Sequence, residues 1–314
     1  MKATLGMNYR MLGYNLESIS NKLYDLRQQS VTGKKLNKPS DDPAAIRPVL
    51  LYGAQSKMTE RYLNHMAVAK GSMELLDSSL GHIGEIMVRA KELGIASISG
   101  TVNDEDLQIF ANQIAALFDE MLQVANSQST GQFIFAGYED KTIPFTKNTD
   151  YNPDDPSTGP LMYYHGDNNI KTVEIAPGNH IQISLTGNAL FLGDADNNGE
   201  VDPGAVNLFS VLNNLEIAVR GNDLENISEG LNLLETGAEQ VRRLKGQMGN
   251  NAWRIDRATE QLEIASIEFK QIISRYEDAD IIDVYSRLVQ QETAFEAALN
   301  VTAKVARLSI LNFM

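Results

Sequence analysis

The sequence predicts a mainly α-helical protein with a β-rich insertion, in which both termini form a long antiparallel helical bundle or coiled coil and a small β domain faces outward. Three observations support this prediction. Apolar residues recur at steps of three and four at each end of the 314-residue chain, the spacing that lines one face of a helix. Long helical patterns lie between those ends. A segment rich in Pro, Asn, Asp and Gly interrupts them with short strand-like runs.

The amino-terminal helix is predicted from an apolar seam with heptad-like spacing. A helix of about 28 residues would be roughly 40 Å long, at about 1.5 Å per residue, and it could not bury this seam alone. The seam therefore predicts a partner helix. Its residues are Leu5, Tyr9, Leu12, Leu16, Ile19, Leu23 and Leu26.

The carboxyl-terminal helix is the expected partner. Asp280 is placed to cap this helix, with Asp283 at its third position. An alternative is that both terminal helices belong to an ordinary monomeric core, because periodicity alone does not distinguish the two arrangements. The second seam consists of Ile281, Val284, Leu288, Phe295, Ala298 and Val305, and it is widened on one side by Leu299, Ala306, Ile310 and Phe313. We expect contacts between Leu12, Leu16, Ile19 and Leu23 on one helix and Leu288, Phe295 and Leu299 on the other.

Helix-start signals divide the rest of the chain. Pro43 follows a possible cap at Asp42, and Asn103 precedes three acidic residues that favour a first helical turn. Asn222 with Glu225 resembles a cap and its third position. We expect three regions: a terminal coiled-coil assembly region of residues 1–32 and 281–314, a helical bundle of residues 33–137 and 205–280, and a β-rich outer domain of residues 138–204.

The composition excludes several classes of function. The chain has 27 Lys and Arg against 41 Asp and Glu, a net charge of −14, which disfavours general binding to nucleic acid or to an anionic membrane. Only residues 1–50 are basic, with 8 bases and 4 acids. The absence of cysteine excludes disulfides, thiol nucleophiles and cysteine-ligated metals. No apolar stretch reaches the roughly 18 residues of a membrane span, and no amino-terminal signal sequence is visible.

Recognised catalytic motifs are missing from the sequence. It has no phosphate-binding or dinucleotide-binding glycine loop, no nucleophile elbow and no zinc-binding histidine pair on one helix. Loop acids such as Asp154 and Asp155 leave a hydrolase formally open, but no base and nucleophile accompany them. We therefore expect no enzyme activity and no cofactor.

One short sequence resembles a calcium loop. Asp194, Asp196 and Asn198 match its first ligand positions, and Asp202 falls at the ninth. The twelfth position is Ala205, where a bidentate Glu is needed. A turn rich in Asp, Asn and Gly is the commoner explanation, and calcium binding is the alternative.

Two strings of residues carry a resemblance to a known family. The first is Val31-Thr-Gly-Lys-Lys-Leu-Asn-Lys-Pro-Ser-Asp-Asp-Pro43, a basic turn followed by a capped helix start. The second is Gly131-Gln-Phe-Ile-Phe-Ala-Gly137, followed in order by Pro144-Phe145, by Tyr164-His-Gly-Asp167 and by the run from Ile281 to Met314. Together they resemble the flagellin superfamily in the form carried by its hook-associated members, over nearly the whole chain. The motif positions are Pro39, Ser40, Asp41, Asp42, Pro43, Phe135, Ala136 and Gly137.

The resemblance implies a structural adaptor of the bacterial flagellum at the hook–filament junction, secreted unfolded by the flagellar export apparatus. Its implied partners are the first hook-associated protein, flagellin, further copies of itself in a ring, and an export chaperone at the carboxyl-terminal helix. We expect residues 1–32 and 281–314 to be loosely ordered until assembly. The alternatives are a flagellin-type filament subunit and, with less support, a calcium-binding or adhesive secreted coiled-coil protein.

Overall fold

A computed structural model describes residues 5–99, 102–153 and 158–311, without the side chains of residues 5, 6, 8, 9 and 306–311. The chain forms two compact units. The first unit comprises residues up to Glu60 and from Glu263 onward, and the second unit comprises Arg61–Leu262. No helix within the described ranges is long and apolar enough to span a membrane.

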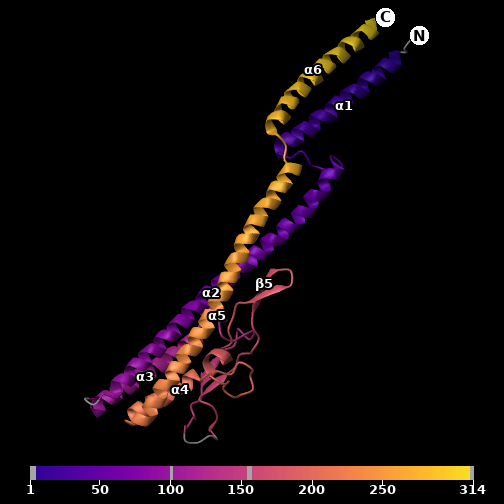
Figure 1. The fold of residues 1–314 in the computed structure, drawn as a ribbon. Coiled ribbons are helices and arrows are strands. Elements are labelled where there is room, and N and C mark those ends of the chain that lie inside the picture. The colour runs from indigo at the N-terminus through magenta and orange to yellow at the C-terminus, as the bar shows by residue number, and fades with distance from the viewer. Residues whose placement is uncertain (1–4, 100–101, 154–157, 312–314) are drawn as a thin grey trace. The chain divides into compact units, whose positions relative to one another are not determined.

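The mainly α fold predicted from the sequence is confirmed, and the β-structure is small (Figure 1). Its strands pair in order of sequence as antiparallel two-stranded sheets, β1 with β2, β3 with β4 and β5 with β6. The helices are α1 (Leu5–Thr32), α2 (Pro43–Ser97), α3 (Asp104–Ala125), η2 (Asn188–Leu192), α4 (Leu208–Arg220), α5 (Leu224–Glu277) and α6 (Ile281–Leu311). The strands are β1 (Gln128–Ser129), β2 (Gln132–Phe133), β3 (Phe145–Lys147), β4 (Met162–Tyr164), β5 (Thr172–Ala176) and β6 (Asn179–Gln182).

In the first unit, α1 and α6 lie side by side and run antiparallel, so that residues from the two ends of the sequence are neighbours (Figure 1). The Gln291 side chain donates to the carbonyl oxygen of Ile19 at 3.4 Å. At the other end of the pair, the Ala279 N–H donates to the Gly33 carbonyl oxygen at 2.9 Å. The pairing of terminal helices that the two seams predict is therefore present.

Side-chain caps begin three helices at the residues expected from the sequence. The Asp42 carboxylate accepts from the backbone N–H two residues later, at 2.9 Å, at the start of α2. Asn103 forms a reciprocal capping box at the start of α3. The Asp280 carboxylate accepts from the backbone N–H two residues later, also at 2.9 Å, at the start of α6. Each bond satisfies an N–H that has no partner within its helix.

The expected cap at Asn222 was wrong by one residue. Asn222 has a positive φ of 53°, a left-handed conformation that an Asn tolerates better than most residues. Asp223 is the capping residue, because its carboxylate accepts from the backbone N–H of Asn226 at 3.1 Å. Asn222 instead makes the turn that ends α4 and starts α5.

The core of the second unit joins the β-rich segment to the helices. Phe145 and Phe191, from the segment between α3 and α4, lie with ring centroids 5.3 Å apart. Phe191 stacks on Phe209 of α4 at 5.5 Å. The β-rich segment therefore shares its core with the helices, and the division into three regions stays a prediction. Fully buried helical residues of this core include Leu76, Leu80, Ile83, Ile114, Met121, Leu212 and Leu215.

Candidate assembly site

The described residues of the two predicted seams are only partly buried in the pair of α1 and α6. Leu23 is 6% exposed and Val284 is 5% exposed, near the base of the pair. Leu12, Leu16, Ile19, Leu26, Leu288 and Phe295 are half-buried, whereas Ile281 and Leu299 are exposed. The side chains of Leu5, Tyr9 and Ile310 lie outside those described. The individual pairs expected across the seam stay predictions.

A polar contact accompanies the seam. The Arg27 guanidinium lies 2.9 Å from the Glu292 carboxylate, and both side chains are largely exposed. Exposed ion pairs of this kind contribute about 0–1 kcal/mol. The contact shows that Arg27 and Glu292 lie close together across the pair, and it adds little to its stability.

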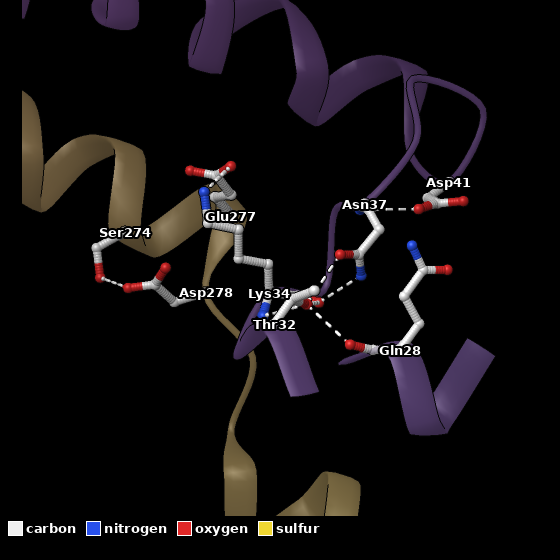
Figure 2. Close-up of polar contacts among 8 residues, drawn as sticks. All are labelled: Gln28, Thr32, Lys34, Asn37, Asp41, Ser274, Glu277 and Asp278. Atoms are coloured by element: carbon white, nitrogen blue, oxygen red, sulfur yellow. Dashed lines mark hydrogen bonds and ion pairs between the residues drawn. The ribbon is translucent and has the colours of Figure 1, made fainter. Parts of the chain in front are cut away.

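A polar clasp, defined as residues 32–41 together with residues 274–279, closes the base of the helix pair (Figure 2). The Lys34 ammonium lies 2.7 Å from the Glu277 carboxylate. The Lys35 N–H donates to the Glu277 carbonyl oxygen at 2.8 Å, and Lys34 and Asp278 form an isolated antiparallel bridge. Two segments more than 230 residues apart in sequence are thus joined by both backbone and side-chain bonds.

The first family motif supplies the turn of this clasp. Gly33 has a φ of +70°, which an L side chain adopts only with strain. The Thr32 hydroxyl and the Asn37 side-chain oxygen lie 2.8 Å apart, and the Asp41 carboxylate accepts from the Asn37 N–H at 2.9 Å (Figure 2). Asp41 therefore closes the turn and Asp42 caps α2. Pro39 and Ser40 are exposed within the turn, and Pro43 is the first residue of α2.

The second family motif packs the β-rich segment. Phe135 and Ala136 are fully buried, and Gly137 has a φ of +70°. A Cβ on Gly137 would lie 1.9 Å from the Asp167 Oδ1. That carboxylate oxygen accepts from the Tyr138 N–H at 2.8 Å. The Tyr164 hydroxyl donates to the Phe135 carbonyl oxygen at 2.9 Å.

Electrostatics at this motif follow from the same contacts. Burial raises the pKa of the Tyr164 hydroxyl, so it stays protonated and donates. Burial works to raise the pKa of Asp167 as well, but hydrogen bonds from Asn169 and from the Tyr138 N–H outweigh it and hold that pKa below its usual value. The motif is thus a packing device whose groups have internal partners.

Further exposed apolar side chains on these two helices were not predicted from the sequence. We call them the outer stripe and define it by Met7, Met11 and Tyr14, near the amino end of α1, and by Ile282, Tyr285 and Val289, at the start of α6, which lies at the other end of the antiparallel pair. Its members are strongly exposed, with Tyr14 at 71% and Ile282 at 83%. Within each helix these residues are spaced by three and four positions, which is helical periodicity that the sequence alone could have indicated.

The calcium-like loop uses its carboxylates internally. Asp194 accepts from the backbone N–H groups of Asn198, at 3.1 Å, and Gly199, at 3.0 Å, and Asp202 accepts from the Ala195 N–H at 2.8 Å. Across residues 5–99, 102–153 and 158–311, no group of three or more acidic or histidine side chains is placed to hold a metal ion. These bonds are typical of a turn rich in Asp, Asn and Gly, and calcium binding by the loop stays a prediction.

Two family models, one for each end of bacterial flagellin, match the chain. The bacterial flagellin N-terminal helical region matches residues 6–140, and the bacterial flagellin C-terminal helical region matches residues 231–314. Together these matches cover more than half of the chain, including α1, α6 and the clasp. The chain therefore belongs to the flagellin family.

The chain is also similar to individual proteins and solved structures. Flagellar hook-associated protein 3 of Salmonella typhimurium is 27% identical over 310 residues, which covers 92% of this chain and 92% of that protein. A flagellin of Listeria monocytogenes is 23% identical over 101 residues, which covers 32% of this chain. The crystal structure of the flagellar junction protein FlgL from Legionella pneumophila aligns with a TM-score of 0.58 and 13% identity, and covers 75% of this chain and all of that chain. That likeness shows a shared fold.

Proposed function

We propose that this chain is a structural adaptor of the bacterial flagellum at the hook–filament junction, between the first hook-associated protein and the flagellin filament. The Salmonella relative carries the name of a hook-associated protein and matches at nearly full length, whereas the flagellin match covers about a third of the chain. This contrast favours the adaptor over a filament subunit. The proposal gives the chain no catalytic role.

The proposal is supported by the exposed and half-buried apolar side chains that α1 and α6 carry beyond those that the pair buries. Most described seam residues are half-buried, and the side chains of the outer stripe are exposed. Full burial of one large apolar side chain is worth roughly 1.5–3 kcal/mol. Neighbouring subunits supply the missing surface, so the helix pair forms the inner layer of a polymer of this chain and its flagellar partners.

The same burial pattern supports ordering on assembly. Among the α1 side chains described, Leu23 is buried and the rest are half-buried or exposed. A helix with so few buried contacts gains little stability from its own chain and opens locally at low free-energy cost. We infer that residues 1–32 and 281–314 are loosely ordered in the free monomer. Such a state suits export of an unfolded chain and capture of the carboxyl-terminal helix by an export chaperone.

Deletion of the gene tests the proposal. Cells that lack the protein should keep intact hooks and release flagellin monomers into the medium, because filament growth then has no adaptor to start from. Re-expression of the full chain should restore filaments. Normal filaments on the deletion strain would contradict the adaptor, and loss of filament length alone, with growth still starting at the hook, would favour a filament subunit.

A further inference from the structure

The loop between η2 and α4 contains a chemically reactive pair of residues. Asn198 is followed by Gly199, and this is the single Asn-Gly pair in the 314-residue sequence. In any protein the backbone nitrogen after an Asn can attack the side-chain amide carbon and release ammonia. Glycine hinders this attack least, because it has no Cβ and adopts backbone conformations that other residues avoid. The groups around the pair decide whether the attack is promoted.

The side chain of Asn198 is folded back over the peptide bond that follows it. Its amide oxygen accepts from the Glu200 N–H at 2.7 Å, which forms an Asx turn and bends the Asn side chain towards its own backbone. Gly199 continues the turn with a φ of +85°. Attack on the amide carbon turns this oxygen into an oxyanion, and a backbone N–H that already donates to it stabilises the developing charge.

The attacking nitrogen must also lose its proton. The Gly199 N–H donates to the Asp194 Oδ2 at 3.0 Å, and the Asn198 N–H donates to the other oxygen of that carboxylate at 3.1 Å. Asp194 is 6% exposed, so little water competes for these oxygens. A carboxylate is ionised at neutral pH, and at hydrogen-bond distance it can accept the proton.

The leaving group has a partner as well. The side-chain nitrogen of Asn198 donates to the Asp196 Oδ2 at 3.1 Å. This bond and the one from the Glu200 N–H together orient the amide, because its oxygen faces a donor and its nitrogen faces a carboxylate. A base, an oxyanion donor and a held leaving group therefore surround one amide carbon.

We propose that Asn198 is a self-modification site that undergoes deamidation. The Gly199 nitrogen forms a bond to the Asn198 side-chain carbon, the bond from that carbon to its amide nitrogen breaks, and ammonia leaves with the proton that Asp194 removed from Gly199. One water molecule then opens the resulting succinimide ring. Opening at one carbonyl gives aspartate, and opening at the other gives isoaspartate, in which the main chain runs through the side chain.

The product changes the charge and the backbone of the loop. Residues 194–202 already hold four acids and no base, and deamidation adds a further carboxylate. Isoaspartate also lengthens the main chain by one carbon, which breaks the Asx turn. The reaction needs only the chain and water, so this inference goes beyond the proposed function and does not depend on it.

Timed incubation of the full chain tests the proposal. The chain is held at neutral pH with a chelator, then digested and analysed by peptide mass spectrometry, with isoaspartate detected by methyltransferase labelling. We expect both products to accumulate at position 198 about tenfold faster in the folded chain than in urea, where the ordered partners are lost. Asn126 is the internal reference and should stay unmodified, because both ends of its amide are bonded to the Phe145 backbone.

Two matched variants test the role of Asp194. Asp194→Asn removes the negative charge and keeps the shape of the side chain. It should slow the reaction about tenfold, a small effect for a base because a carboxylate is a weak one. Asp202→Asn removes a charge from the same loop, where the carboxylate accepts from the Ala195 N–H, and it should leave the rate unchanged.

The contrary outcomes are equally specific. Slower modification in the folded chain than in urea would overturn the proposal, because the loop would then protect the bond, and so would an unmodified Asn198 in both. An unchanged rate in Asp194→Asn, or an equal fall in both variants, would remove Asp194 as the base. The comparison of folded and unfolded chain decides the matter even if Asp194→Asn fails to fold.

Discussion

Gly137→Ala should destabilise the second unit far more than Gly131→Ala, although both glycines belong to the same motif string and both have positive φ. The strain of placing an L residue in that conformation costs roughly 1–2 kcal/mol at either position. At Gly131 nothing lies within 4 Å of the new Cβ, whereas at Gly137 it would meet the Asp167 side chain at 1.9 Å and its carbonyl oxygen at 2.6 Å.

The additional loss at Gly137 comes from displacing Asp167. Its carboxylate accepts from the Tyr138 N–H at 2.8 Å and from the Asn169 side chain at 2.7 Å. Losing two hydrogen bonds to a charged acceptor costs about 2–4 kcal/mol after allowance for partial exposure. Gly137→Ala should therefore cost about 3–6 kcal/mol in total and Gly131→Ala about 1–2 kcal/mol.

Urea unfolding followed by circular dichroism measures both variants, and peptide-level hydrogen exchange assigns the loss to the second unit or elsewhere. The reasoning predicts a clearly lower midpoint for Gly137→Ala, with faster exchange in peptides around Asp167. Equal midpoints for the two variants would refute it, because the close approach to Asp167 would then carry no energetic weight.

Three further changes have defined outcomes. Leu16→Asp should block incorporation into flagella and leave the second unit folded. It places a carboxylate in the half-buried seam, at a cost of roughly 2–4 kcal/mol. Immunoblots of sheared flagella measure the incorporation. Asp42→Ala should cost about 1 kcal/mol by removing the α2 cap, measured as a shift in urea midpoint. Hydrogen bonding to Lys91 lowers the pKa of Glu235 to about 2. The unmodified chain should therefore be more stable than Glu235→Gln above pH 4.5, and this difference in the free energy of unfolding should vanish as the pH falls through about 2.

Matched changes control these predictions. Ser20→Asp adds the same charge at an exposed α1 position and should incorporate normally; failure of both variants would implicate charge and not the seam. Asp42→Asn keeps a capping oxygen and should recover most of the loss. Lys91→Ala should raise the pKa of Glu235 towards its ordinary value in an NMR titration, and an unchanged pKa would remove the stated cause.

Local signals predicted much of the fold because they act within a few residues. The caps at Asp42, Asn103 and Asp280 are short-range bonds between a side chain and the next turn, so the sequence contains all the information they need. The heptad spacing likewise predicted that the two terminal helices pair with each other. The error at Asn222 arose because Asn and Asp are both good caps, and the left-handed turn between α4 and α5 selected Asp223.

Contacts between residues far apart in the sequence could not be predicted from local patterns. The Lys34–Glu277 pair joins residues 243 positions apart, and no spacing rule connects them. Phe135 and Phe145 stand in the strings that carry the family resemblance, but nothing in those strings indicates that they pack against Phe191 and Phe209 from elsewhere in the chain. The outer stripe has helical periodicity in the sequence, but only the structure shows that its side chains stay exposed when α1 and α6 pair.

Immunogold labelling of the chain on intact flagella tests directly whether this chain stands at the hook–filament junction. We expect label at one narrow site, where the distal end of the hook meets the filament. Label distributed along the filament, or absent from the hook–filament boundary of otherwise normal flagella, would contradict it.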